Sequence, residues 1–230
     1  MSSFVIEAAG LSRSFGSTRA LAGVDLSVRT GESLAIMGAS GSGKTTLLHC
    51  LAGITRPDAG TVGFVSGAGR VEVTGLGERE RSRLRREAFG FVFQQGLLIP
   101  ELTAVENVAL ALMLNGMPRA RAEEHGRGWL AALGLAGMED RRIGQLSGGQ
   151  AQRVAIARAQ VTGASVVFAD EPTGALDSAT SADVMRALLD STTGQGRTLI
   201  LVTHDAEVAG RCSRIVDMRD GRIVGERVSA

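Results

Sequence analysis

One segment constrains the fold of this chain more than any other: residues 38–45 read Gly-Ala-Ser-Gly-Ser-Gly-Lys-Thr. An apolar run of strand length, 34–37, comes directly before it, and the helix-forming stretch 46–51 follows it. The segment matches the pattern G-x-x-x-x-G-K-[ST], in which glycines let backbone N–H groups turn inward around a phosphate at a helix N-terminus. The sequence therefore predicts a strand, a phosphate-binding loop and a helix in that order.

Short apolar runs recur along the chain and alternate with longer amphipathic stretches, at 34–37, 89–93, 166–169 and 199–202. This alternation predicts an α/β fold with a mainly parallel sheet. The runs end, in chain order, at the lysine loop, at Gln94, at Asp170-Glu171 and at Thr203-His204. Because ligands of open α/β sheets bind beyond the carboxyl ends of the strands, we expect these side chains to converge on one pocket.

The flanking segments have other periodicities. Residues 4–7 and 24–28 alternate as antiparallel strands do, and 214–218 and 222–226 flank the hairpin-type turn Asp220-Gly221. From about 102 to 145 the pattern is helical, with apolar residues on one face. We expect a single domain over 1–230, with an N-terminal antiparallel β subdomain and a helical subdomain inserted at roughly 98–160. The glycine-rich segment 61–72 is ambiguous, although Val62 and Phe64 could face a core from a short strand.

Composition excludes some kinds of partner. A formal net charge of +1 over 230 residues gives no global electrostatic case for nucleic acid or an anionic membrane. No stretch has the roughly 18 to 20 apolar residues that span a bilayer, and residues 1–4 lack the character of a secretion signal. Any link to a membrane is therefore expected to come through another protein. Cys50 and Cys212 match no metal or redox spacing, so we expect reduced thiols in a cytosolic protein.

Nearly all basic residues are arginines, since Lys44 is the single lysine among 25 lysines and arginines. Coding bias is the plain explanation, but a lysine that persists marks a place where a compact ammonium is required. Lys44 is expected to reach the β- and γ-phosphates, with the Thr45 hydroxyl on Mg²⁺. Asp170 would hold Mg²⁺ through water, and Glu171 would act as general base on the attacking water. Paired acids at a strand end can also be a helix cap or a turn.

Residues 146–150, Leu-Ser-Gly-Gly-Gln, run directly into a long helical stretch. Ser147 and two glycines at a helix N-terminus predict a second anion site, while a bare Ser-Gly-Gly can equally be a flexible loop. Together with the phosphate loop, Asp170-Glu171 and His204, this segment resembles an ATP-binding cassette (ABC) ATPase subunit over essentially the whole chain. The motifs 90–94, 102–108 and 170–177 are similar to a bacterial branch of that family. Its members serve lipoprotein extraction, macrolide export, antimicrobial-peptide resistance and cell-division signalling.

The resemblance implies a head-to-tail homodimer on the cytoplasmic face of the cell membrane, coupled to an integral-membrane permease and not to nucleic acid. ATP and Mg²⁺ would lie between the phosphate loop of one subunit and Ser147–Gln150 of the other. Gln94 would sense the γ-phosphate and Mg²⁺, and most coupling would pass through the helical subdomain and residues 94–107. His204 would contact the γ-phosphate, and Asp177 the opposing subunit. Phe15 would stack on adenine, although it could instead be a core residue.

The candidate site residues fall into three groups by expected role. The catalytic group is Lys44, Gln94, Glu171 and His204, and the metal group is Thr45, Gln94 and Asp170. The nucleotide-binding group is Phe15, Gly38, Ala39, Ser40, Gly41, Ser42, Gly43, Lys44, Thr45, Thr46, Ser147, Gly148, Gly149, Gln150 and Asp177. A soluble ABC ATPase acting on DNA or ribosomes is the alternative function, and a regulatory cassette with little turnover is a third. Neither the transported substrate nor the direction of transport follows from these motifs.

One charged run, residues 78–87, contains five arginines. It could be a nucleic-acid patch, but acids and arginines at helical spacing favour a solvated helix with the pairs Glu78–Arg81, Glu80–Arg83 and Arg83–Glu87. His49 and His125 have no supporting motif and are expected to be structural.

Overall fold

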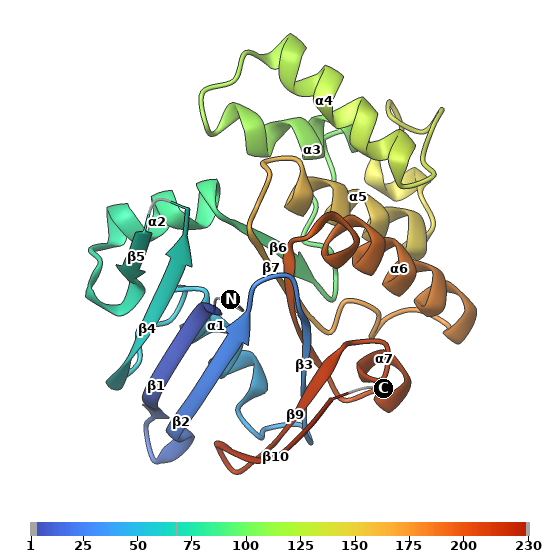
Figure 1. Ribbon diagram of the computed structural model, residues 1–230. Coiled ribbons are helices and arrows are strands. Elements are labelled where there is room, and N and C mark those ends of the chain that lie inside the picture. The colour runs from blue at the N-terminus through green and yellow to red at the C-terminus, as the bar shows by residue number, and fades with distance from the viewer. Residues whose placement is uncertain (1–3, 68, 229–230) are drawn as a thin grey trace.

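The computed structural model describes residues 4–67 and 69–228. These residues form a four-stranded sheet, a six-stranded sheet and a set of helices (Figure 1). Residues 1–3, on which the expectation about a secretion signal rests in part, lie outside the described range. Among the described residues, no helix combines the length and the apolar character needed to cross a bilayer.

The six-stranded sheet has the order β10-β9-β3-β8-β7-β6. Its strands are β3 (Ser33–Met37), β6 (Phe89–Phe93), β7 (Val166–Asp170), β8 (Thr198–Thr203), β9 (Arg214–Arg219) and β10 (Arg222–Val228). All neighbouring pairs are parallel except β9 and β10. Asp220 and Gly221 both have positive φ, as the predicted hairpin turn requires. The expectation that the four apolar runs are parallel neighbours is confirmed.

The four-stranded sheet is antiparallel, with the order β2-β1-β4-β5. It consists of β1 (Phe4–Phe15), β2 (Thr18–Arg29), β4 (Ala59–Ser66) and β5 (Gly69–Glu72). Val62 and Phe64 on β4 are buried, which confirms that they face a core. A short 3₁₀ turn, Val73–Gly75, connects this sheet to the next helix.

Both faces of the six-stranded sheet are buried because neighbouring strand residues point to opposite sides. Leu34 and Ile36 of β3 join a core shared with the four-stranded sheet and α1 (Lys44–Leu51). Ala35, between them, joins a second core made with the helices on the other face. The sheet thus forms the middle layer, with one hydrophobic core on each of its faces.

The chain leaves the six-stranded sheet after Phe93 and returns at Val166. Between these points lie α3 (Ala104–Met113), α4 (Arg119–Ala132), a 3₁₀ turn at Ile143–Gln145 and α5 (Gly148–Gln160). This helical part, green to yellow in Figure 1, lies at the top of the view. The remaining helical elements are α6 (Ser178–Ser191), a 3₁₀ turn at Thr193–Gln195 and α7 (Ala206–Ala209).

The arginine-rich helix α2 (Glu78–Glu87) has no buried residue. Arg81 and Arg85 pair with Glu78, and Arg83 pairs with Glu87. Two of the three predicted pairs therefore form. The predicted Glu80–Arg83 pair is wrong, because the Glu80 carboxylate accepts a hydrogen bond from the backbone N–H of Gly77 at the helix start. The two cysteines are free and buried, and burial raises the pKa of Cys50 to about 11 and that of Cys212 to about 12.

Candidate functional site

The phosphate loop connects β3 to α1 and has little room for side chains. A Cβ atom on Gly38 would lie 2.3 Å from the carbonyl oxygen of Met218, and one on Gly43 would lie 2.2 Å from that of Ala20. Both glycines also have positive φ. Neighbouring β2 and β9 therefore hold the loop at a distance that only glycine permits.

Lys44 and Ser42 supply unusual polar groups to this loop. Lys44 is 7% exposed, and its ammonium donates to the carbonyl oxygens of Gly38 (2.8 Å) and Ala39 (2.9 Å). The Ser42 hydroxyl is buried, and no hydrogen-bond partner reaches it within the described part of the chain. A cation without a bonded carboxylate and a buried hydroxyl without a partner fit a phosphate group.

Thr45 and Asp170 meet across the site from α1 and β7. The Thr45 hydroxyl donates to Asp170 Oδ1 at 3.2 Å. Burial raises the pKa of Asp170 above its usual range, and the bond from Thr45 opposes that change. In the described ranges, no group of three or more His, Cys, Asp or Glu side chains could hold a metal ion. One hydroxyl and one carboxylate instead fit Mg²⁺, which takes few protein oxygens and completes its shell with water and phosphate.

Glu171 lies just beyond the end of β7 in a rare backbone conformation, with φ of 46°. Its backbone N–H donates to Val202 O at 2.9 Å, and its carboxylate accepts from the Thr203 hydroxyl at 3.2 Å. His204 Nδ1 lies 2.8 Å from Glu171 Oε1. A non-glycine residue in this region stores strain that the neighbouring strand β8 compensates, a feature that concentrates at functional sites.

A cavity of 650 Å³ lies at this edge of the sheet. The predicted residues that line it are Ala39, Ser40, Gly41, Gly43, Lys44, Thr45, Thr46, Gln94, Glu171 and His204. Side chains from the ends of β3, β6, β7 and β8 thus meet at one place, as the strand pattern predicts. The predicted residues that do not line this cavity are Gly38, Ser42, Asp170, Ser147–Gln150, Asp177 and Phe15.

Ser147 and Asp177 begin two other helices. Ser147 caps α5: its hydroxyl accepts from Gln150 N at 3.3 Å, and Gln150 Oε1 accepts from Ser147 N at 2.9 Å. Asp177 caps α6 by accepting from Thr180 N at 3.0 Å. Ser147 and Gly148 are exposed. The segment 147–150 is therefore an ordered helix start and not a flexible loop.

Phe15 ends β1 and is 50% exposed, so the interpretation of Phe15 as a core residue is wrong. The Arg13 guanidinium lies 4.8 Å from the centre of its ring.

The cavity also includes Thr18 and Ala20, which no sequence motif identified, because β2 contributes them from a separate sheet. No sequence motif predicted the hydrogen bond from the Thr203 hydroxyl to the Glu171 carboxylate either. Burial lowers the pKa of His49, and the nearby Asp170 carboxylate opposes this change.

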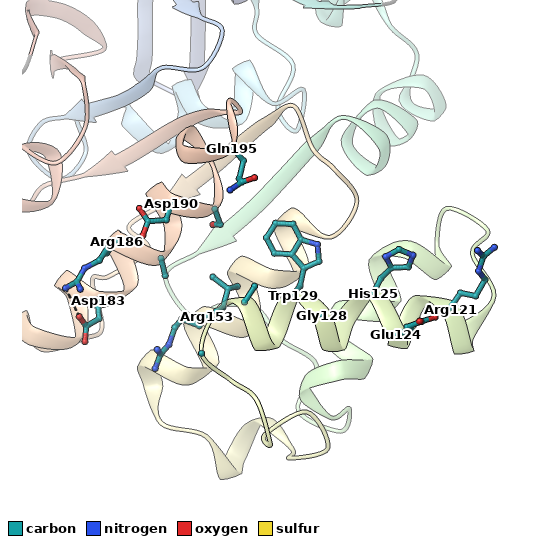
Figure 2. A pocket seen from close by; sticks show the side chains of 15 residues that line it. Arg121, Glu124, His125, Gly128, Trp129, Arg153, Asp183, Arg186, Asp190 and Gln195 are labelled. Carbon is teal, nitrogen blue, oxygen red and sulfur yellow. Dashed lines mark hydrogen bonds and ion pairs between the residues drawn. The ribbon is translucent and has the colours of Figure 1, made fainter.

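A larger cavity, of 1090 Å³, lies away from the phosphate loop between α4, α5 and α6 (Figure 2). His125 and Trp129 face it from α4, and Arg153 faces it from α5. Three arginines and three acidic residues line this groove, so its charges favour neither anions nor cations. None of the predicted site residues lies there.

Comparison with known proteins places these features in a family. A family model described as "ABC transporter" matches residues 21–174. The macrolide export ATP-binding/permease protein MacB of Azoarcus sp. (strain BH72) is 47% identical over 226 residues, which is 96% of this chain and 34% of that protein. The pyoverdine export ATP-binding/permease protein PvdT of Pseudomonas aeruginosa is 50% identical over 206 residues, which is 90% of this chain and 30% of that protein. The chain spans about a third of the length of the curated relatives it matches.

Solved structures of similar fold cover nearly the whole chain. The dimeric post-hydrolysis state of the ATP-binding cassette MJ0796, bound to ADP and Pi, has a TM-score of 0.86 at 35% identity. The match covers 98% of this chain and 99% of that one. A second dimeric structure of MJ0796, a bacterial ABC transporter cassette, has a TM-score of 0.88 at 36% identity.

Proposed function

This chain belongs to the ABC transporter family as one of its ATPase cassettes, and we propose that it hydrolyses ATP between two head-to-tail copies of itself to drive a membrane partner. The partner is an integral-membrane permease, the cassette lies on the cytoplasmic face of the membrane, and the work done is export or mechanotransmission. Residues 1–230 act as one ATPase domain, with the helical part at roughly 98–160 as its movable element.

One observation carries the proposal: the anion-binding features are divided between two places. The cavity at Lys44 contains the phosphate loop, whereas the exposed helix start at Ser147 lies outside it. An N-terminus with free N–H groups favours a phosphate, so a second copy facing the first would complete the site. The dimeric cassette structures of 35% and 36% identity support this arrangement.

Under this proposal, each residue at the strand ends has a role that its geometry supports. Glu171 orients and deprotonates the attacking water, while its bond to His204 keeps that side chain aimed at the γ-phosphate. Lys44 exchanges its two carbonyl partners for phosphate oxygens and offsets their charge. Gln94, at the end of β6, senses the γ-phosphate and the metal. Phe15, exposed at the end of β1, stacks on adenine, and Asp177 contacts the opposing copy.

The remaining loop residues bind phosphate oxygens mainly through their backbone N–H groups, with Gly38 and Gly43 as the positions that require glycine. Thr45 and Asp170 would hold Mg²⁺, the hydroxyl directly and the carboxylate through water. Bound there, the ion offsets charge that develops on the transferred phosphoryl group. Burial raises the pKa of Asp170, and a cation bound beside this carboxyl group would favour its ionised form.

The membrane partner would bind beside the loop that follows β6. A groove there is lined by Phe89, Phe91 and Phe93 of β6 together with Leu97 and Leu114. Leu97 and Leu114 are 59% and 62% exposed, which is costly for leucine unless another protein covers them. Replacing both with aspartate should abolish recovery of the permease with the cassette from detergent-solubilised membranes. Unchanged recovery would contradict this docking surface.

A mixing experiment tests the shared site. Lys44→Ala removes the phosphate cation, and Ser147→Asp keeps a good helix cap while placing a carboxylate against the incoming phosphate. Each variant alone should be inactive. Mixed in equal amounts, they should recover roughly a quarter of the parent activity, because half of randomly paired dimers are mixed and each has one intact site.

The control is a chain with both substitutions, which cannot restore a site when mixed with Lys44→Ala. The proposal fails if the two single variants give neither turnover nor ATP-dependent association when they are combined.

A further inference from the structure

Helix α5 reaches the loop after β6 through two side chains. Gln152, which is 4% exposed, donates from Nε2 to Phe93 O at 3.0 Å. Arg158 donates to both Leu97 O and Gly96 O at 2.6 Å. The helix that begins at Ser147 therefore holds the loop that contains Gln94, through three hydrogen bonds to backbone carbonyls.

The conformation of this loop is strained. Leu97 has φ of 46° and Gly96 has φ of 67°. Glycine adopts this region freely, but a leucine there is strained by its Cβ atom. The Arg158 guanidinium bonds the carbonyls of both residues, so it acts on the peptides that carry the strain. Without these two hydrogen bonds, the Leu97 backbone should relax to an unstrained conformation, and its exposed side chain should change position.

The other end of the loop is fixed separately by α3. Asn107 is 1% exposed, accepts from Ile99 N at 2.8 Å and donates to the carbonyls of Ile99 and Thr103, each at 3.0 Å. Because Asn107 anchors residues 99–103, the stretch that α3 does not anchor is short and lies between Gln94 and Leu98. Its conformation then depends on α5.

Arg158 forms no ion pair with any acidic residue in the described ranges 4–67 and 69–228. Burial lowers its pKa, since the charge is partly removed from water. A half-buried guanidinium without a carboxylate is costly if it only fills space. Among the residues that the structure describes, its side chain forms two short hydrogen bonds, both to this loop, which indicates that Arg158 holds the loop.

We propose that Arg158 and Gln152 are positioning residues that transmit the position of the α5 N-terminus to Gln94 and Leu97. This inference rests on the proposed function, in which Ser147 binds the ATP of the opposing copy. When Ser147 binds that ATP, α5 moves as a rigid body. The hydrogen bonds that Gln152 and Arg158 donate to the loop, here called the clamp, then move the Phe93–Leu97 backbone with the helix. Helix α5 thereby sets the positions of both Gln94, which senses the γ-phosphate, and Leu97, which belongs to the docking surface.

Hydrogen exchange and steady-state kinetics on the full chain test the clamp. Arg158→Gln should speed exchange of the Gly96 amide, which donates to Phe93 O at 2.8 Å, by about tenfold or more, the effect of losing hydrogen bonds from a charged donor to this loop. It should lower kcat for ATP several-fold and leave KM within about twofold, because the nucleotide-binding groups are untouched. Adding Leu97→Asn should restore at least part of kcat, because asparagine accepts the left-handed conformation without the clamp.

The matched control is Arg153→Gln on the same helix, whose side chain faces the groove of Figure 2 and not the loop. It should behave as the parent chain does. Equal losses in both variants, unchanged exchange in Arg158→Gln, or no recovery with Leu97→Asn would each overturn the clamp. A parent chain without ATP turnover would instead overturn the proposed function, while the exchange contrast would still decide whether Arg158 holds the loop.

Discussion

Glu171 and His204 are joined by a contact of 2.8 Å between Oε1 and Nδ1. They follow neighbouring parallel strands, β7 and β8, so one step across the sheet separates them. The other carboxylate oxygen of Glu171 accepts from Thr203. Both oxygens are therefore held by β8, and the carboxylate has a fixed orientation before substrate arrives. Such preorganisation lowers the cost of reaching the transition state.

Glu171→Gln should leave ATP binding intact and lower turnover by at least about a hundredfold, the usual contribution of a general base. The amide keeps the shape and a hydrogen-bonding oxygen but cannot take a proton. ATP should therefore hold two copies together, which size-exclusion chromatography with ATP would detect as a stable dimer.

Glu207→Gln is the control, because Glu207 is exposed and near the site without a role in it. It should turn over ATP as the parent does. Normal hydrolysis in Glu171→Gln would reject Glu171 as the base.

Lys44 provides a chemical test, since it is the single lysine of the sequence. Lys44 is buried and its ammonium is bound to two carbonyls, so an amine-directed reagent should modify it slowly. ATP should slow the reaction further by engaging the same ammonium. Peptide mass spectrometry reports modification of Lys44 separately from that of the α-amino group, which serves as an internal reference. Equal modification with and without ATP would mean that Lys44 does not contact phosphate.

Phe15→Ala should weaken ATP binding by about tenfold, since stacking of an aromatic ring on a base contributes roughly 1–3 kcal/mol. Because half of the ring is already exposed, the stability of the chain should change little. Binding of ATP and of inorganic triphosphate can be compared by calorimetry. Only ATP has a base, so a loss for both ligands would contradict stacking on adenine.

Phe168→Ala, in contrast to Phe15→Ala, should lower the stability of the chain substantially. Phe168 is 1% exposed, and its ring centre lies 5.1 Å from that of Phe89 and 5.7 Å from that of Phe91. Truncating a buried aromatic side chain costs about 3–5 kcal/mol of unfolding free energy. Denaturant titration would measure this loss, and a cost under about 1 kcal/mol would contradict the burial of Phe168 in the core that the two sheets share.

Asp170 predicts a dependence of stability on pH. Burial raises its pKa above the ordinary 3.8, so the folded chain retains this proton at higher pH than the unfolded chain does. The unfolding free energy therefore falls as pH rises from the unfolded pKa through the folded one, and it stays lower above that window. Asp170→Asn removes the ionised form. In the absence of ATP and Mg²⁺, it should melt at a higher temperature than the parent at about pH 7.

The difference between the two melting temperatures should shrink as pH falls through the folded pKa of Asp170 toward the unfolded value of 3.8, because the parent carboxyl group then becomes neutral as well. The exposed Asp190, changed to Asn, is the control for loss of a surface charge. A difference between Asp170→Asn and the parent that does not vary with pH would contradict the burial of this carboxylate.

Much of the fold was predictable because its signals are local. The run before the phosphate loop, the alternating flanks and the hairpin at Asp220-Gly221 each depend on a few adjacent residues. The segment 61–72 was harder, since its glycines weaken the strand pattern. Its two strands depend on pairing with distant or neighbouring strands, β4 with β1 and β5 with β4. The Glu80–Arg83 pair failed for a local reason, because the helix start at Gly77 competes for the same carboxylate.

The sequence by itself determined the chemistry of this protein: a lone lysine in a glycine loop, an acidic pair after one strand and a histidine after another. Parallel strands place their carboxyl ends along one edge, so the meeting of these groups followed from the strand pattern. The tertiary structure alone decided which groups touch. It bent Glu171 into a strained conformation against β8, placed Ser147 outside the cavity of its own chain, and brought Arg158 to the Leu97 carbonyl, 61 residues away. Contacts between residues so distant depend on packing, which no local pattern encodes.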